Sequence, residues 1–304
     1  MSSGDTPAVA RRKVRLAIKD ARLRKGDTQS QVAEAMEWSL SKVMRIESGE
    51  VTISQNDLRP LLAYLGVKDR KTIEDLVQAA KASKQRRQWW DDKRYHGLLT
   101  PAMRQLISFE AEATAIRSFA PAVLPGWLQT EAFARAIISP FAHELTEAEI
   151  DARAAIRTVR REMIRQRDPR PEVFAVLDES VLLRKFGGSK TSREQFAEIG
   201  KMIAEGWVHI RIHPLESPFS PFGHYDLLYL SPDQNSHAVL YRESGTVDEI
   251  VDDPIRIARH REAWDHLWNA AIDEKESAAR IAAAAESPAA ADADKRPADQ
   301  GSPD

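Results

Sequence analysis

Ser41, Lys42 and Arg45 place a hydroxyl, an ammonium and a guanidinium within two turns of one short predicted helix. On a helical wheel with Val43 and Ile46 facing inward, Ser41 and Arg45 lie together on the outward side and Lys42 lies beside them. An arginine can bridge the O6 and N7 atoms of guanine, and a serine can donate or accept a hydrogen bond in the same groove. This face is therefore equipped to read base edges in the major groove of DNA.

Short helices separated by turn signals must position these side chains. Gly26 ends a first helix, and Thr28 is the predicted N-cap of a second helix of about two turns. Ser39 then opens the third helix, which ends before Gly49. Residues 28–47 thus contain a short helix, a tight turn and a second short helix, which is the arrangement of a helix-turn-helix.

This stretch also resembles a known family. The matching features are Arg22 seven residues before Gln29, the run VAEAM, and Ser39, Arg45, Ile46, Glu47 and Gly49. Through them residues 8–66 are similar to the XRE helix-turn-helix of phage repressors and many bacterial regulators. The resemblance implies a lambda-repressor-like helical bundle.

The resemblance also implies roles for single residues in DNA binding. Gln29, at the start of the second helix, is expected to contact the DNA backbone, while Leu40, Ser41 and Arg45 fall at base-reading positions. Leu40 departs from the family, where this position is often polar. It can touch a thymine methyl group but cannot donate a hydrogen bond.

Four further residues frame this site. Arg22 and Glu47 match a buried ion pair of the family, and the helical wheel independently places Glu47 towards the inward side. We expect this pair to be structural, with little net effect on stability. Ser54 and Asn56, at the start of a fourth helix, are candidates for phosphate contacts through backbone amides, although an ordinary N-cap explains them equally well.

The pattern of the chain changes after Pro169. From residue 89 to about 167 it is helical, whereas residues 173–177, 207–213, 225–230 and 238–241 are predicted strands. A helix is expected between the first two strands. A last helix carries Ile257, Trp264 and Leu267 at helical spacing and is expected to pack on the sheet.

The predicted fold class is mainly α with a smaller α+β part. We expect a helix-turn-helix DNA-binding domain over residues 8–66, a helical linker over 67–88, a mixed helix/sheet effector or partner-binding domain over 89–275, and a disordered tail over 276–304. The tail is rich in alanine and Ile281 is its only large aliphatic residue. Such a composition buries too little apolar surface to offset the entropy of ordering.

The second half resembles a further group of proteins. WWDD from Trp89, FEAEATAIRSF from Phe109, LPGWLQTEAFARA from Leu124, the arginine-rich helix and LDESVLLR from Leu177 are similar to the C-terminal domain of actinobacterial regulators. That domain has no known function and is sometimes described as antitoxin-like. Such regulators often lie beside genes for very small proteins, which implies a small protein partner.

Arginines at helical spacing form a second candidate site. Arg153, Arg157, Arg160 and Arg161 share one face of a predicted helix. A solvated helix face is one interpretation, and a site for an anion or an acidic partner is the other.

The sequence shows no recognisable motif of an enzyme active site. The chain has no cysteine, and GxSxG, GxGxxG and GxxxxGK[ST] do not occur. Asp178 and Glu179 are adjacent and point to opposite faces of a strand, which is poor geometry for shared chemistry. His209 and His213 share a strand face but lack an identifiable third metal ligand. We therefore expect no enzyme, no metal and no cofactor.

Charge is divided unevenly along the chain. Residues 1–88 hold 18 Lys and Arg against 11 Asp and Glu, whereas the remainder holds 26 against 35. A basic end on an acidic body favours contact between that end and a polyanion such as double-stranded DNA. No export signal and no run of 18 apolar residues occur, so we expect a cytoplasmic protein without membrane contact.

Together these features predict a sequence-specific DNA-binding transcriptional regulator that acts as a homodimer. Its C-terminal domain would sense a small molecule or a small protein partner. The alternative is an antitoxin-like protein that mainly binds a small protein partner and uses DNA binding for autoregulation.

Overall fold

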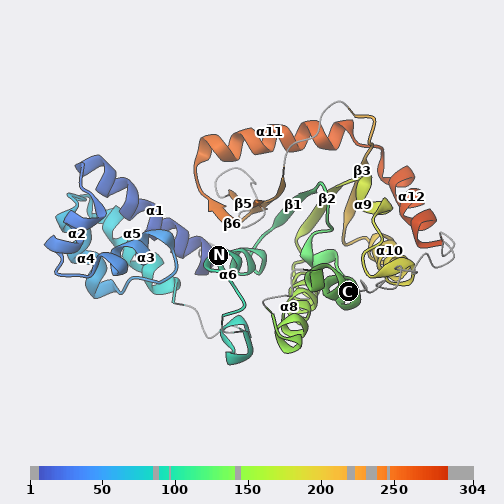
Figure 1. The fold of residues 1–304 in the computed structure, drawn as a ribbon. Coiled ribbons are helices and arrows are strands. Elements are labelled where there is room, and N and C mark those ends of the chain that lie inside the picture. Colours follow the sequence, from blue (N-terminus) through green and yellow to red (C-terminus); the bar gives the residue numbers. More distant parts are fainter. Residues whose placement is uncertain are drawn as a thin grey trace, which may run out of the picture. The chain divides into compact units, whose positions relative to one another are not determined.

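The computed structural model describes residues 7–84, 89–95, 97–140, 145–217, 223–230, 238–244 and 247–286. The chain divides into two compact units, of which the first holds the residues up to Ala113 and the second holds nearly all of the remainder. The first unit is helical, and the second is built around a sheet (Figure 1).

Five helices form the main body of the first unit. They are α1 (Pro7–Lys25), α2 (Gln29–Ala35), α3 (Leu40–Ser48), α4 (Gln55–Tyr64) and α5 (Arg70–Ala82). The side chains of Thr28, Ser39 and Ser54 each accept a hydrogen bond from a backbone amide three residues on, which confirms the predicted starts of α2, α3 and α4. Gly49 adopts φ 81° and closes α3, as expected for a left-handed C-terminal cap.

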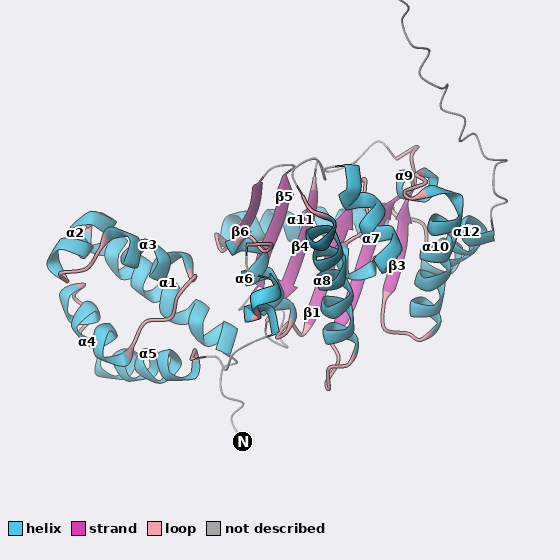
Figure 2. Ribbon diagram, turned by 60° about the horizontal axis from the view of Figure 1, so that its bottom comes forward, coloured by secondary structure: helices cyan, strands magenta, loops and turns pink. Residues whose placement is uncertain are grey.

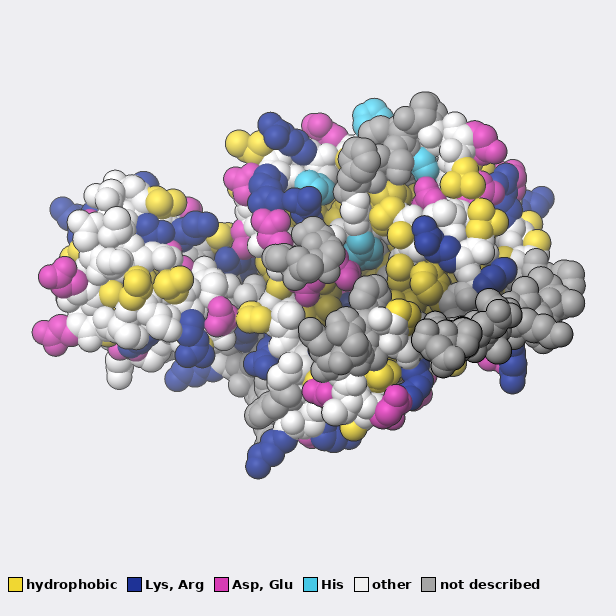
Figure 3. Space-filling view, viewed as in Figure 1, with side chains coloured by type: hydrophobic (Ala, Val, Ile, Leu, Met, Phe, Trp, Pro, Cys, Tyr) yellow, Lys and Arg dark blue, Asp and Glu magenta, His cyan; other side chains and the backbone are white. Residues whose placement is uncertain are grey.

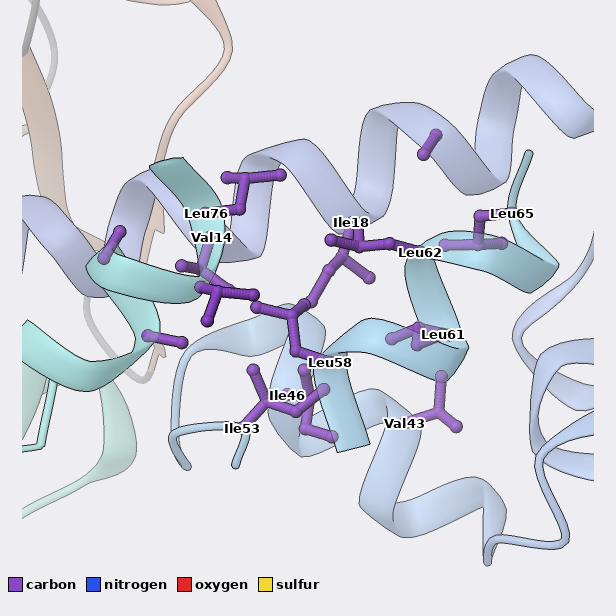
Figure 4. Close-up of a cluster of buried hydrophobic side chains, with 14 of the residues drawn as sticks. Val14, Ile18, Val43, Ile46, Ile53, Leu58, Leu61, Leu62, Leu65 and Leu76 are labelled. Carbon is purple, nitrogen blue, oxygen red and sulfur yellow. The ribbon is translucent and has the colours of Figure 1, made fainter. Parts of the chain in front are cut away.

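Aliphatic side chains from all five helices meet in one core. Val14 and Ile18 of α1 lie against Leu58 and Leu62 of α4, and Val43 and Ile46 of α3 close the core from another side (Figure 4). Since these residues recur at helical spacing, each helix turns one apolar stripe inward. The core therefore fixes which face of α3 points to solvent.

The expected linker over residues 67–88 is wrong for the greater part of its length. Its helix α5 packs into the first core, where Leu76, Val77 and Ala80 are buried. The segment has few large apolar residues, but its alanines allow neighbouring helices to approach closely, so a short stripe is enough to bind it. Residues 85–88 lie outside the described residues.

The expected start of the second domain at residue 89 also differs from the structure. The short 3-10 helices η1 (Trp89–Asp91) and η2 (Lys93–Tyr95) and the helix α6 (Pro101–Glu110) belong to the first unit. The boundary between the units falls after Ala113, immediately before the first strand.

Six strands form the sheet of the second unit. They are β1 (Ala115–Ala120), β2 (Glu172–Asp178), β3 (His209–His213), β4 (His224–Tyr229), β5 (Ala238–Ser244) and β6 (Val247–Val251), in the order β3-β2-β1-β4-β5-β6. The pairs β1–β2 and β2–β3 are parallel, with Ser118 opposite Ala175, whereas β5 and β6 are antiparallel. The sheet is therefore mixed.

Helices cover both faces of this sheet. They are η3 (Gly126–Leu128), α7 (Glu131–Ile138), α8 (Glu147–Arg165), α9 (Ser180–Leu183), α10 (Gly188–Ala204), α11 (Pro254–Ala270) and α12 (Glu274–Glu286). In Figure 2, α8 lies in front of the sheet and α11 lies behind it. Among the described residues, no helix combines the length and the apolar character needed to cross a bilayer.

The predicted fold class, a helical bundle followed by a mixed helix and sheet domain, is confirmed. The helical interpretation of residues 89–167 is wrong at β1, which lies inside the sheet. Four of its six residues are apolar and buried, and they come from both faces, so the strand lacks the alternation that reveals a half-exposed strand. The strand β6 was likewise not predicted.

The tail prediction is wrong for residues 276–286, which belong to α12. Ile281 and Ala284 are buried there, and the Ser277 hydroxyl accepts a hydrogen bond of 2.9 Å from the Ile212 amide of β3. Alanine has the highest helix propensity, so an alanine-rich segment that finds a surface to pack on forms a helix. Residues 287–304 lie outside the described residues.

Candidate nucleic-acid interface

Local hydrogen bonds build the start of α2 and the turn between α2 and α3. The Thr28 hydroxyl accepts from the Gln31 amide at 3.2 Å, and the Gln31 side chain accepts from the Thr28 amide at 2.8 Å, which is a capping box. Glu37 adopts φ 55° in the turn, and the Trp38 amide donates to the Ala33 carbonyl at 2.8 Å. The contacts of Glu37 and Trp38 lie between α2 and α3 and shape the turn that joins the two helices.

A buried ion pair ties α1 to α3. Arg22 Nε and Nη2 donate to Glu47 Oε1 and Oε2 at 2.6 and 2.8 Å, and both residues are buried. Hydrogen bonding to Glu47 raises the pKa of the Arg22 guanidinium above its ordinary value. Because the geometry is bidentate, the pair fixes the orientation of both helices as well as their spacing.

Gln29 joins the same network. Its Nε2 atom donates to Glu47 Oε2 at 2.8 Å, so α2 is held to α1 and α3 through one carboxylate. The sequence did not predict this contact. One amide hydrogen of Gln29 remains to donate to a DNA phosphate group, and the residue is only half-buried.

The outward face of α3 carries the predicted base-reading residues. Ser41 and Arg45 are exposed, as the helical wheel predicted, with 54% of the Arg45 side chain accessible. Leu40 and Met44 are also exposed, at 43% and 50%. Hydrophobic side chains are visible on the surface of the helical unit in Figure 3. Met44 was not among the predicted site residues, although its spacing of four from Leu40 places the two on one helix face.

The Arg45 guanidinium makes only a weak ion pair. Its Nε atom lies 3.6 Å from Glu50 Oε2 in an exposed ion pair. Exposed pairs of this kind contribute about 0–1 kcal/mol, so exchanging Glu50 for a DNA partner costs little. Arg45 is therefore free to move to a base edge.

The position of Lys42 differs from the prediction that it lies beside Ser41 and Arg45. Its Nζ atom lies 3.1 Å from Asp57 Oδ2 and 3.8 Å from the centroid of the Trp38 ring. These two contacts direct the ammonium towards α4 and the turn before α3. The structure thus does not bring Lys42 together with Ser41 and Arg45.

The start of α4 fits the N-cap interpretation. The Ser54 hydroxyl accepts from the Asp57 amide at 3.0 Å, and Asn56 is exposed in the first turn. A cap on Ser54 leaves other amides of the first turn without helical partners. Both interpretations of these residues are therefore compatible with the geometry.

The arginines of α8 divide into two groups. Arg153 and Arg160 lie close enough to act on the charge of Arg157, and Arg160 is buried. Arg161 instead approaches Glu162 at 3.5 Å and Glu198 of α10 at 4.0 Å. The structure thus brings three of the four predicted residues together and separates Arg161 from them.

The residues considered for enzyme chemistry have separate partners. Asp178 Oδ1 accepts from the Ser180 amide at 3.0 Å, whereas Glu179 pairs with Arg280 of α12 at 2.6 Å. His209 contacts Glu274 at 2.8 Å, and the buried His213 lies 3.8 Å from Asp178. Across the described part of the chain, no group of three or more possible ligands is arranged to hold a metal ion.

Two family models match the chain. A helix-turn-helix domain matches residues 16–76, which contain α2, α3 and their supporting helices. This match supports DNA binding by the helix-turn-helix of the first unit. No curated protein and no solved structure gives a significant match. The second model, the domain of unknown function DUF5753, matches residues 103–283, and the chain therefore belongs to the DUF5753 family.

Proposed function

We propose that this chain is a transcriptional regulator of the XRE type that recognises a specific DNA sequence through α3. The outward face of α3 carries this proposal, because Ser41 and Arg45 are exposed there on a helix that buried contacts hold in place. A guanidinium on a fixed helix can form two parallel hydrogen bonds to guanine, and each such pair contributes about 1–3 kcal/mol of discrimination between bases.

Contacts to the DNA backbone complete the interface. We assign Gln29 to a phosphate group through its remaining amide hydrogen, and the start of α4, with Ser54 and Asn56, to a second phosphate group. Phosphate contacts orient a protein on the duplex but do not read sequence. We assign Lys42 a smaller role, because Asp57 already binds its ammonium.

The test is a selection of genomic DNA fragments by the full-length protein at physiological salt, since non-specific binding is largely electrostatic. We expect one enriched motif. Arg45→Ala should lose about 1–3 kcal/mol of affinity and the preference at one base position. Arg59→Ala is the matched control, because Arg59 is an exposed arginine of α4 that pairs with Glu74 at 3.0 Å. Equal weakening by Arg45→Ala on all sequences would assign Arg45 to a phosphate group instead.

We further propose that two copies bind a pseudo-palindromic site in the cytoplasm. One recognition helix reads only a few base pairs, and paired half-sites one helical turn apart are the usual arrangement for this motif. The enriched motif should then contain two inverted half-sites. A single half-site bound by one copy would contradict this part of the proposal.

For the second unit we propose a regulatory role without catalysis, in which it senses a small molecule or a small protein partner. A second candidate function is that of an antitoxin-like protein whose main task is to bind a small protein. The excess of acidic residues after residue 88 favours it, because it offers charge to a basic partner. A motif that is enriched only when such a partner is present would support the second candidate.

A further inference from the structure

The inner side of α8 faces a polar region of the sheet. Ser118 of β1 and Asp226 and His224 of β4 form a chain of contacts there, in which the Ser118 hydroxyl donates to Asp226 Oδ1. His224 Nε2 lies 3.5 Å from Asp226 Oδ2. Both carboxylate oxygens of Asp226 are therefore already occupied by neighbours on the sheet.

Arg157 of α8 lies in this region without an acidic partner. Its guanidinium donates through Nη1 to the Arg153 carbonyl of its own helix at 3.1 Å, and no carboxylate of the described residues is within 4.0 Å. Burial and the charges of Arg160 and Arg153 lower the pKa of Arg157 to about 10, although the charge of Glu243 partly offsets them. At neutral pH, the protein therefore holds a positive charge that it stabilises poorly.

Two residues whose charges act on Arg157 each have a buried polar atom that has no hydrogen-bond partner among the described residues. These atoms are Arg153 Nε on α8 and the hydroxyl of Tyr241 on β5. Tyr241 is only 2% exposed. Burial raises the pKa of Tyr241 above its ordinary value, so its hydroxyl keeps its proton and can donate. Almost all buried polar groups in native proteins are hydrogen-bonded, so a group of unpaired donors in one place requires an explanation.

The backbone is shaped to hold these arginines. A Cβ atom at Gly126 would lie 3.2 Å from Arg160 Nη1 and 3.6 Å from Arg157 Cγ. A larger residue at Gly126, the first residue of η3, would therefore press on the Arg160 guanidinium, whereas its contact with Arg157 would be an ordinary van der Waals contact. The backbone of η3 thus packs directly against the Arg157 and Arg160 side chains.

We propose that Arg153, Arg157 and the Tyr241 hydroxyl form a binding site for a small molecule that carries a carboxylate or phosphate group. Such a group offers a negative charge to Arg157 and acceptor oxygens to the Arg153 Nε and Tyr241 hydroxyl donors. Arg157 is half-buried. A small anion can therefore reach its guanidinium more readily than the flat surface of a protein partner can. The further claim that this ligand is the regulator's effector rests on the proposed function.

The experiment measures thermal unfolding of the full-length protein in inorganic phosphate, in citrate and in sodium chloride of equal ionic strength. We compare wild type with Arg157→Met, which keeps the bulk of the side chain, and with Arg161→Met, which removes an arginine of the same helix that lies within 4.0 Å of Glu162 and Glu198. At least one of the two anions should raise the Tm of wild type and of Arg161→Met in a saturable way. The more effective anion identifies the ligand as a phosphate or a carboxylate.

Arg157→Met should show a higher Tm than wild type without anion, because it removes a half-buried charge that has no carboxylate partner among the described residues, and it should lose the anion response. If Arg157→Met does not fold, Arg153→Met takes its place and should need at least tenfold more anion for half of the shift. No shift with either anion, or an equal shift in every variant, would overturn the site.

The effector claim is tested separately with a DNA fragment from the selection. The anion should change the affinity of wild type for this fragment at least threefold but leave that of Arg157→Met unchanged. If the anion response of the Tm depends on Arg157 but no fragment is enriched, the site stands and the regulator proposal fails. An enriched fragment whose affinity ignores the anion would overturn the effector claim alone.

Discussion

Buried charge is treated differently in the two units of this protein. In the first unit, the Arg22 guanidinium is paired with both oxygens of Glu47, and Gln29 binds the same carboxylate. In the second unit, Arg157 is half-buried beside two other arginines, and no carboxylate of the described residues lies within ion-pair distance of it. A fully paired group fixes a frame, whereas an unpaired one leaves binding energy for a ligand.

The position of the exposed arginine of the first unit supports this distinction. Arg45 is 54% exposed with one weak partner, so its charge stays hydrated until DNA replaces the water. The hydrogen bonds that hold α3 are buried, whereas the Arg45 side chain that we assign to DNA is exposed and weakly bound. In the second unit, by contrast, the functional group that we propose is itself part of the buried layer.

We expect the largest loss of stability from Glu47→Leu, which removes the buried Arg22–Glu47 pair of the first unit. The substitution leaves Arg22 buried without its partner and should lower the free energy of unfolding of the first unit by about 3–5 kcal/mol. Urea unfolding followed by circular dichroism measures this loss. The double variant Arg22→Met with Glu47→Leu should recover a large part of it, because an apolar pair carries no uncompensated charge.

The exposed acid Glu50 provides the matched control. Its side chain is 37% exposed and its pair with Arg45 spans 3.6 Å, so Glu50→Leu should change stability by less than about 1 kcal/mol. A loss for Glu47→Leu as small as the loss for Glu50→Leu would show that the buried pair does not fix the frame.

Sequence and structure agree where local signals decide the outcome. Thr28 and Ser39 were recognisable as N-caps, and the wheel placed Ser41 and Arg45 outward because Val43 and Ile46 had to face the core. Such features depend on residues a few positions apart. They are visible without knowledge of the remaining chain.

The features that the sequence did not reveal depend on distant partners. Lys42 turns towards Asp57 and the Trp38 ring, and α12 forms because β3 and α10 offer it a surface. The polar region below α8 joins side chains from β1, β4, β5 and α8, so only the assembled sheet shows that Arg157 has no carboxylate partner among the described residues. Spacing along α8 alone grouped Arg161 with it.

The His224–Asp226 pair of the second unit predicts a moderate dependence of stability on pH. Burial lowers the pKa of His224, but the charge and hydrogen bond of Asp226 and the charge of Glu243 outweigh it, against opposition from Arg160, so the pKa is raised. The stabilisation is therefore complete below pH 6.5 and is lost as pH rises through the folded-state pKa. We expect stability to fall with pH there, by at most about 1.4 kcal/mol per pH unit.

Urea unfolding at several pH values compares wild type with His224→Gln, which should lack this slope. The pKa of Asp226 is lowered: burial raises it, but His224 and Ser118 outweigh that effect. Its contribution is therefore lost only as pH falls through that lowered value, in acid. An equal slope above pH 6.5 in both proteins would show that the His224–Asp226 pair does not stabilise the second unit.

The smallest expected effect separates the frame of the first unit from its contact with DNA. Gln29→Ala removes one hydrogen bond to Glu47 and, if our assignment holds, one phosphate contact. It should lower stability by about 0.5–1.5 kcal/mol and weaken binding by a similar amount on every DNA sequence, without changing the preferred motif. Parallel measurements of urea unfolding and of affinity for matched and scrambled fragments give both quantities. Reduced stability with unchanged affinity would make Gln29 a purely structural residue, because the frame would have lost a contact that the DNA never used.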